Sequence, residues 1–264
     1  MESAEGARSF LASGDAYDSF MGRYSRTLAV PFVEASGVVA GHSVLDVGCG
    51  PGALTGVLLD RLGEGAVSAF DPSPPFVAEC AKRHPGVDVR LGRAEQIPFD
   101  GGSFDRALAQ LVLHFVTEPG TAMEELHRVV RPGGVVAACV WDFAEGMEML
   151  RHFWDAALAV DPGAPDEAQT MRFGREGEIA DLFEHAGLDD VSETTLRVSS
   201  TYESFDELWS GFLAGIGPAG SWCVALPDER RAALRSVLFH QLGSPTAGFS
   251  LAATARFARG VRST

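Results

Sequence analysis

The sequence predicts an α/β protein built on a mostly parallel, doubly wound sheet. From about residue 40 to 142, short apolar runs alternate with segments of helical periodicity. The first run, Val44–Val47, leads into a glycine-rich turn and then into a predicted helix over Ala53–Leu62. We expect seven strands, with the last one antiparallel and helices on both faces.

The glycine-rich turn is the most specific feature of the chain. Gly48, Gly50 and Gly52 stand at alternate positions, with Cys49 inside the turn and Asp46 just before it. Glycine is needed where the backbone turns sharply or lies against a ligand. The spacing is not the G-x-G-x-x-G of dinucleotide-binding turns. A carboxylate at Asp46 suits a ligand that carries an ammonium group and a sulfonium cation better than it suits a pyrophosphate.

A second acidic residue follows the next predicted strand, Ala66–Asp71. Asp71 lies about twenty residues past the glycine turn, where doubly wound sheets place an acid to hold ribose hydroxyls. The neighbouring Pro72 and Ser73 are assigned to the same site. The alternative is that Asp71 only caps the helix that begins near Pro74.

Together these residues resemble motif I and the following strand of the class I S-adenosylmethionine-dependent methyltransferases. Later segments, chiefly Val87–Phe99, Ser103–Gln110 and Leu126–Val140, resemble the methyltransferase type 11 group that includes the ubiquinone/menaquinone-biosynthesis enzymes. The resemblance covers about residues 40–142. It implies a Rossmann-like fold, S-adenosylmethionine as cofactor and methyl transfer as the reaction.

The resemblance also implies cofactor contacts. The glycine turn would cradle the methionyl end of the cofactor, and Gln110 would lie above it at the end of the fourth strand. The loop after the third strand would meet the adenine ring. The family often has an acid where this chain has Arg93, so the contact would pass to the backbone at Ala94 or to Glu95. For Glu95 a purely structural role in a surface loop is the alternative.

Two further residues are weaker candidates. Arg23 (or Arg26) could bind the methionyl carboxylate with a two-pronged hydrogen bond, although a solvated helix face explains the same pattern. His114 follows Gln110 closely and could act as a general base. It stands in an apolar run that enters a helix, so a structural role is the alternative.

The whole chain, 1–264, is interpreted as a single methyltransferase domain. Residues 15–40 form a helical lead, and 41–142 form the cofactor-binding core. Residues 143–200 and 249–264 complete the sheet, and 201–248 form a helical cap between strands six and seven. In these outer parts we expect helices at 147–159, 177–186, 204–215 and 227–243, a loop at 216–222, and strands at 188–199 and 249–261. Four cap aromatics could line an apolar acceptor pocket or simply form core: Trp209, Phe212, Trp222 and Phe239.

The composition limits the kinds of partner that the protein is expected to have. The formal net charge is −15 and Lys82 is the only lysine, which disfavours nucleic acid as a partner. No apolar run approaches a membrane span. The four cysteines show neither metal spacing nor a disulfide framework. We therefore expect a cytoplasmic protein with no metal and no membrane partner.

The favoured function is a methyltransferase that acts on a small-molecule metabolite. The alternatives are a non-catalytic S-adenosylmethionine-binding regulatory protein, or a methyltransferase for protein or RNA. The acceptor atom, the need for a general base, the pathway and the oligomeric state are left open at this point.

Overall fold

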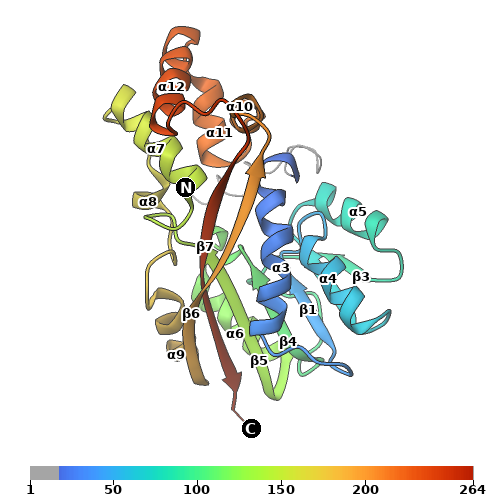
Figure 1. Ribbon diagram of the computed structural model, residues 1–264. Coiled ribbons are helices and arrows are strands. Elements are labelled where there is room, and N and C mark those ends of the chain that lie inside the picture. Colours follow the sequence, from blue (N-terminus) through green and yellow to red (C-terminus); the bar gives the residue numbers. More distant parts are fainter. Residues whose placement is uncertain (1–17, 264) are drawn as a thin grey trace.

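The centre of the molecule is a seven-stranded sheet with the order β3-β2-β1-β4-β5-β7-β6. The computed structural model describes residues 18–263, and Figure 1 shows its architecture. β1 to β5 run parallel, and β7 is antiparallel to both β5 and β6. The predicted α/β class, the seven strands and the antiparallel last strand are confirmed. The strands are β1 (Val44–Val47), β2 (Val67–Asp71), β3 (Asp88–Leu91), β4 (Phe104–Gln110), β5 (Val130–Trp141), β6 (Leu188–Tyr202) and β7 (Phe249–Arg262).

Helices cover both faces of this sheet. α3 and α4 lie side by side on one face, and α6 and α9 contact each other on the opposite face (Figure 1). The helical segments are η1 (Asp18–Gly22, a π-helix), α3 (Arg23–Ala35), α4 (Ala53–Leu62), α5 (Pro74–Arg83), η2 (Leu113–Phe115, a 3₁₀ turn), α6 (Pro119–Val129), α7 (Glu148–Val160), α8 (Glu167–Thr170), α9 (Glu178–His185), α10 (Phe205–Leu213), α11 (Gly217–Ala225) and α12 (Asp228–Gln241). Of the predicted lead, residues 15–17 lie outside the described residues.

The strand order places the ligand-binding crevice. All four residues of β1 are buried, as expected for a parallel strand covered on both faces. The chain moves from β1 outward to β2 and β3, and then returns to β4 on the other side of β1. Ligands of open α/β sheets bind at the carboxyl ends of the strands where the order reverses in this way. The glycine turn after β1 and the residues after β4 therefore face the same crevice.

A helical cap stands at one end of the molecule. β6 and β7 are the longest strands, and they continue past the rest of the sheet toward α10, α11 and α12 (Figure 1). α7 packs against both α11 and α12. The segment after β5 thus contributes to the cap, whereas the sequence assigned it to the remainder of the sheet. The cap is larger than the predicted insertion 201–248.

One predicted loop is a helix. The sequence predicts a loop at 216–222, but α11 occupies most of it. Pro218 is tolerated because it stands in the first turn of α11, where no intrahelical N–H is lost. Small residues let α11 approach its neighbours closely, since a Cβ added to Gly220 would lie 2.9 Å from the backbone of Gly215. Packing against the cap therefore overrides a composition that is typical of turns.

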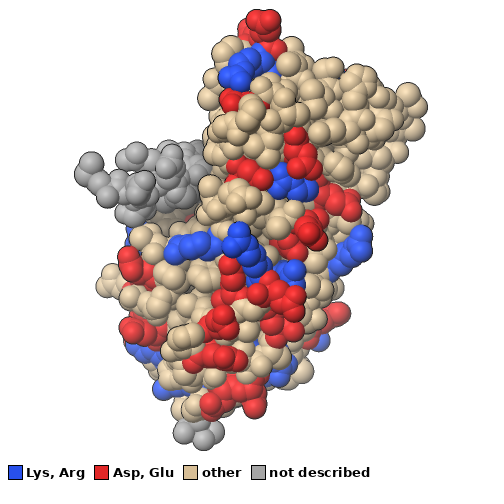
Figure 2. All heavy atoms as spheres, turned by 90° about the vertical axis from the view of Figure 1, so that its left-hand side faces the viewer, with Lys and Arg blue, Asp and Glu red and all other residues tan. Residues whose placement is uncertain are grey.

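The surface carries both charge signs. On the face in Figure 2, acidic side chains are spread over the lower part with basic side chains among them, in keeping with the net charge of −15. No helix within residues 18–263 has the length and apolar character that a membrane crossing requires. Within the same residues, no group of three or more His, Cys, Asp or Glu side chains is placed to hold a metal ion.

Candidate active site

A large cavity opens at the carboxyl ends of β1, β2 and β4. The cavity has a volume of about 530 Å³. Most of the residues predicted to bind the cofactor line it: Asp46, Gly48, Cys49, Gly50, Asp71, Pro72, Ser73, Ala94, Glu95 and Gln110. Gly52 shapes the turn beside the cavity, while Arg23 and His114 lie elsewhere. The lining also contains residues that the sequence analysis did not single out: Ser25, Phe70, Phe76, Val112, Phe115, Val116 and Thr117.

The glycine turn requires glycine for two different reasons. Gly48, Gly50 and Gly52 all have positive φ, at 66°, 53° and 98°. A Cβ on Gly48 would lie 2.7 Å from Val112, and one on Gly52 would lie 2.6 Å from His84. A Cβ on Gly50 would meet nothing within 4 Å, so only its backbone conformation demands glycine. Gly52 precedes α4 without a side-chain cap, which leaves the first N–H groups of α4 available to an anion.

Asp46 is buried at the floor of this cavity. It is only 1% exposed, and the Thr55 hydroxyl donates a 2.6 Å hydrogen bond to Oδ2. Burial, reinforced by the nearby Asp71 and opposed by Thr55, raises the pKa of Asp46 to about 7. An ionised carboxylate in such a dry place is costly unless a cation compensates it. Asp46 is therefore suited to a positively charged ligand.

Asp71 ends β2 and organises the turn around it. Its Oδ2 accepts a 2.9 Å hydrogen bond from Gly50 N, and its Oδ1 accepts a 2.8 Å hydrogen bond from Ser73 N. Ser73, not Asp71, is the N-cap residue of α5. Burial raises the pKa of Asp71 despite the two backbone donors. Since each carboxylate oxygen can accept more than one hydrogen bond, both still have room for ligand hydroxyls.

Glu95 joins two loops at the rim of the cavity. Its Oε1 accepts hydrogen bonds from the backbone of Thr117 at 3.1 Å and Glu118 at 3.4 Å, and its Oε2 lies 3.6 Å from Arg93 Nε. The carboxylate of Glu95 is thus engaged in holding the loops. Ala94, which is buried beside it, lines the cavity as well.

Gln110 connects the end of β4 with α3. Its Nε2 donates a 2.9 Å hydrogen bond to the carbonyl of Ser25. Its Oε1 is buried and has no hydrogen-bond partner among the described residues. A buried unpaired acceptor is unfavourable, and it marks the place where a ligand N–H would be stabilised.

Arg23 is not part of the cavity. Its guanidinium pairs with Glu207 of α10 and lies 4.2 Å above the ring of Tyr202. These contacts hold the lead against the cap, and Arg26 does not line the cavity either. The structure therefore corrects the predicted contact of Arg23 with the methionyl carboxylate, because both partners of its guanidinium belong to β6 and the cap.

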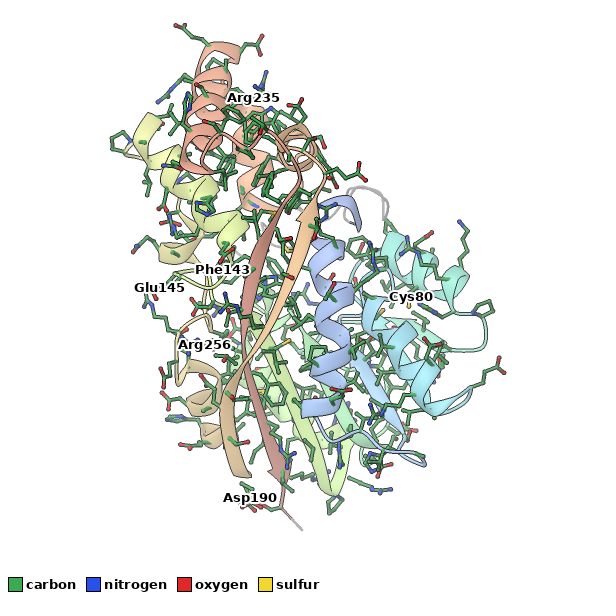
Figure 3. The ribbon with its side chains drawn as sticks, in the orientation of Figure 1. Cys80, Phe143, Glu145, Asp190, Arg235 and Arg256 are labelled. Carbon is green, nitrogen blue, oxygen red and sulfur yellow. The ribbon has the colours of Figure 1, made fainter. Side chains whose placement is uncertain are left out.

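A smaller apolar pocket adjoins the large cavity and shares two lining residues with it, Leu111 and Phe115. The volume of this pocket is about 40 Å³. It is lined from the lead, the core and the cap: Phe20, Met21, Leu111, His114, Phe115, Trp141, Phe143, Leu150, Glu167, Ile216, Gly217, Pro218 and Ala219. Phe143 lies two residues past the end of β5, where the sheet meets the cap helices (Figure 3). We call it the acceptor pocket.

Leu111 lines both the large cavity and the acceptor pocket, and its backbone conformation is strained. Its φ is 61°, which is uncommon for any residue other than glycine. Its N–H is held by the carbonyl of Cys139 at 2.9 Å. Strain of this kind persists only where the surrounding structure enforces it, often at functional sites. A sequence pattern carries no signal for it.

His114 lies in the acceptor pocket and not in the large cavity. Its ring is 3.9 Å from that of Phe115 and 5.4 Å from that of Phe143, between ring centroids. Its Nδ1 is buried without a hydrogen-bond partner among residues 18–263. Burial, with a smaller effect of Arg172, lowers the pKa of His114 to about 3. The imidazole is therefore neutral at physiological pH.

None of the four cap aromatics lines the acceptor pocket, so of their two interpretations the pocket-lining one is wrong. Phe212 is fully buried and stacks on Phe153 at 4.3 Å between centroids. Trp209 packs against Phe212 and Trp222 packs against Phe153, while Phe239 lines a separate surface hollow. The alternative interpretation, ordinary core, holds for the first three. The pocket is instead closed by Ile216–Ala219 of the cap.

Comparisons with known proteins agree with this geometry. A family described as "Methyltransferase domain" matches residues 45–138. An uncharacterised protein of Mycobacterium tuberculosis is 30% identical over 223 residues, which cover 80% of this chain and 77% of that protein. The nocamycin O-methyltransferase of Saccharothrix syringae is 29% identical over 260 residues, which cover 90% of this chain and 91% of that enzyme.

Other comparisons are narrower. Matches to four further curated relatives span only 31% to 51% of the length of those proteins. The solved phosphoethanolamine N-methyltransferase 2 of Haemonchus contortus shares the fold, with a TM-score of 0.55 at 14% identity, over 89% of this chain and 52% of that one. The chain belongs to the class I S-adenosylmethionine-dependent methyltransferases, in the methyltransferase type 11 group, and S-adenosylmethionine is the cofactor of that family.

Proposed function

We propose that this protein transfers a methyl group from S-adenosylmethionine to a small molecule held in the acceptor pocket. The observation that carries the proposal is the contact between the two spaces. The cofactor-sized cavity and the apolar pocket share Leu111 and Phe115. A donor in the cavity and an acceptor in the pocket would therefore be neighbours, which is what a direct transfer requires.

The lining of the large cavity fits the cofactor group by group. Asp71 would accept from the ribose hydroxyls, and the open N-terminus of α4 would receive the methionyl carboxylate. Asp46 would face the positive charge of the cofactor, and the unpaired Oε1 of Gln110 would face an N–H group of the cofactor. The loop at Ala94 would contact the adenine.

The cofactor supplies a methyl group on a positively charged sulfur. The chain supplies alignment and a dry environment, and holding two reactants in place can provide a large part of a rate enhancement. Leu111, Phe115 and Phe143 enclose the region between the two partners with apolar surface. His114 is placed to contact the acceptor as a neutral imidazole.

A small-molecule acceptor is favoured over the alternatives. The acceptor pocket is enclosed by the lead and the cap, which leaves little room for a folded protein or an RNA. The nocamycin enzyme, which is similar along nearly its whole length, is an O-methyltransferase. A regulatory protein without activity would have no need of an apolar pocket beside the cofactor. The four cysteines are free and buried, which supports the proposal of a reducing, cytoplasmic setting.

The test is calorimetry with S-adenosylhomocysteine. We expect one site per chain, and we expect Asp71→Ala to weaken binding by about 1–3 kcal/mol because buried acceptors for ligand hydroxyls are lost. Asp60→Ala, an exposed aspartate on α4, is the matched control and should bind like the wild type. Failure of the wild type to bind at millimolar ligand would contradict the cofactor assignment. Unchanged affinity in Asp71→Ala would limit Asp71 to shaping the turn.

A further inference from the structure

One acidic side chain of the acceptor pocket has no explanation in the cofactor site. Glu167 begins the short helix α8 and is only 4% exposed, yet it lines a pocket of mostly apolar residues. Burying a carboxylate is costly unless it is compensated or used. Its position is on the acceptor side, away from Asp46 and Asp71.

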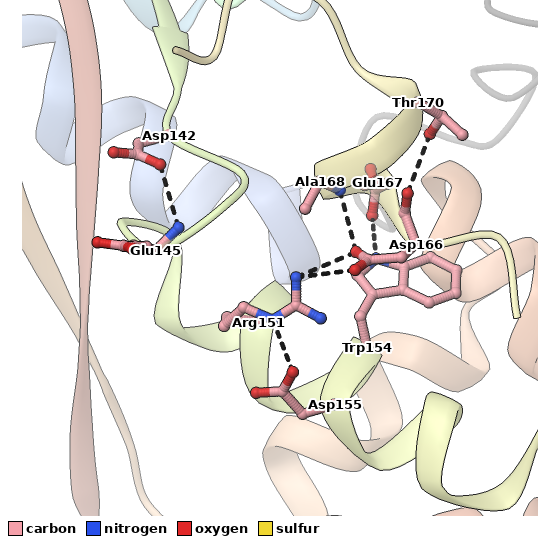
Figure 4. A network of polar contacts seen from close by, with 9 residues as sticks. All are labelled: Asp142, Glu145, Arg151, Trp154, Asp155, Asp166, Glu167, Ala168 and Thr170. Carbon is pink, nitrogen blue, oxygen red and sulfur yellow. Dashed lines mark hydrogen bonds and ion pairs between the residues drawn. The ribbon is translucent and has the colours of Figure 1, made fainter. Parts of the chain in front are cut away.

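The carboxylate of Glu167 is held at one oxygen and open at the other. The indole Nε1 of Trp154 donates a 2.7 Å hydrogen bond to Oε2 (Figure 4). Oε1 accepts no hydrogen bond from any described residue, and Trp154 belongs to the buried core of α7. One oxygen thus fixes the orientation, while the other is free for a molecule in the pocket.

Charged residues next to Glu167 fix the position of α8. Asp166 caps α8 by accepting a 3.0 Å hydrogen bond from Ala168 N. Arg151 of α7 donates to both oxygens of Asp166, at 3.1 and 3.0 Å, and also pairs with Asp155 at 2.9 Å (Figure 4). These bonds tie α8 to α7, so that Glu167 cannot easily turn away from the pocket.

Its proton affinity is suited to exchange near neutral pH. Burial raises the pKa of Glu167 to about 7; the Trp154 hydrogen bond opposes this and the charge of Asp166 adds to it. In the same pocket burial and Arg172 lower the pKa of His114 to about 3. A general base works best when its pKa lies near the working pH. Of these two groups, Glu167 is the more effective proton acceptor.

We propose that Glu167 binds the hydroxyl of a small apolar acceptor of the phenol or enol type and takes its proton during methyl transfer. This inference rests on the proposed function. The O–H bond breaks and its proton goes to Oε1, while the oxygen forms a bond to the methyl carbon. The bond from that carbon to sulfur breaks, and its electron pair stays on sulfur to give neutral S-adenosylhomocysteine.

The chemistry of the pocket favours a hydroxyl over other acceptors. An acceptor carboxylate would place a second negative charge beside Glu167 in a dry space, and like charges disfavour each other strongly there. An ammonium group would stand close to the sulfonium of the donor and would have to lose a proton before reacting. A weakly acidic hydroxyl needs only one proton acceptor, which Oε1 provides.

The experiment uses matched single-ring probes that fit a small pocket. With the 264-residue chain, transfer of a labelled methyl group from S-adenosylmethionine is measured to 4-methylphenol, 4-methylbenzylamine and 4-methylbenzoate. We expect transfer to 4-methylphenol alone. Glu167→Gln should lower kcat by about a hundredfold or more, the usual contribution of a general base, with a smaller change in KM. Glu184→Gln, an exposed glutamate on α9, should match the wild type.

Two further readouts separate this inference from the proposed function. Glu167→Gln should bind S-adenosylhomocysteine as tightly as the wild type, which also shows that it folds. Trp154→Phe removes the donor to Oε2, so the acid limb of the pH profile of kcat should move to higher pH. The charged or titratable groups around Glu167 that could also shift the profile are Asp166, Arg151 and His114, and Trp154→Phe alters none of them. Cofactor binding without transfer to the phenol, or full activity of Glu167→Gln, overturns the role of Glu167; loss of cofactor binding in the wild type overturns the proposed function instead.

Discussion

At the scale of single residues, Asp46 shows how burial prepares a site for a cation. With one hydroxyl donor from Thr55 and 1% exposure, its carboxylate is poorly solvated. Its pKa of about 7 means that the group is largely protonated below neutral pH. A ligand ammonium group favours the charged form. Binding of the cofactor should therefore release a proton from Asp46.

This linkage gives a pH dependence with a definite sign. Below pH 7 the free protein must lose the Asp46 proton before it can pair with the ligand, so the affinity for S-adenosylhomocysteine should fall by up to about tenfold per pH unit. Above pH 7 the affinity should level off. Calorimetry between pH 5.5 and 8.5 measures this slope. In Asp46→Asn the affinity should be lower and independent of pH; a slope that persists there would point to Asp71, the other buried carboxylate of the cavity.

The residues of the cofactor cavity could be predicted because their signals are local. Gly48, Gly50 and Asp71 stand at fixed distances after short apolar runs, and the fold brings those positions together. Glu167 carries no such signal, since α8 has only four residues and follows a proline-rich stretch. The strained backbone of Leu111 has no sequence signal either. For Arg23 the sequence predicted a cofactor contact that the structure does not show. Its actual partner, Glu207, is 184 positions away in the sequence.

At the scale of elements, the core was predictable and the cap was less so. The helix over Ala53–Leu62 has the predicted bounds, and β7 extends one residue beyond its predicted end. Pro132 and Gly133, residue types typical of turns, lie within β5 where its register with β4 shifts. α11 was missed because Gly220 serves close packing, while only Gly217, at the start of the helix, has the positive φ of a turn. In both cases tertiary contacts decide what a proline–glycine segment becomes.

The glycine turn offers a test that separates stability from binding. Gly50 and Gly63 both have positive φ, at 53° and 82°, and a Cβ added at either position would meet nothing within 4 Å. Gly50→Ala and Gly63→Ala should each lower the free energy of unfolding by about 1–3 kcal/mol, the cost of placing a residue with a Cβ in a positive-φ conformation. Only Gly50 lines the cavity, so only Gly50→Ala should also weaken S-adenosylhomocysteine binding. Urea denaturation and calorimetry measure the two effects, and equal loss of binding in both variants would show that backbone strain alone is responsible.

At the scale of the whole molecule, the acceptor pocket depends on parts that are distant in the sequence. Phe20 and Met21 come from the lead, His114 from the core and Ile216 from the cap. The lead is joined to the cap by the Arg23–Glu207 pair, and to the end of β6 by the hydroxyls of Tyr24 and Tyr202, which lie 3.2 Å apart. The cofactor cavity lies mainly within the core. Loosening the cap should therefore affect the acceptor without affecting the cofactor.

Glu207→Gln tests this division. The change removes the charge that pairs with Arg23 but keeps an oxygen for the N–H of Glu203, which Glu207 accepts at 2.6 Å. A partly exposed ion pair contributes up to about 1 kcal/mol, so hydrogen exchange in α10 and the start of α3 should become about fivefold faster. The affinity for S-adenosylhomocysteine should stay unchanged. Asp206→Asn is the matched control, because Asp206 pairs with Arg235 inside the cap and has no ion pair with the described part of the lead. Equal effects of the two variants, or a loss of cofactor affinity in Glu207→Gln, would mean that the cap and the cofactor cavity behave as one unit.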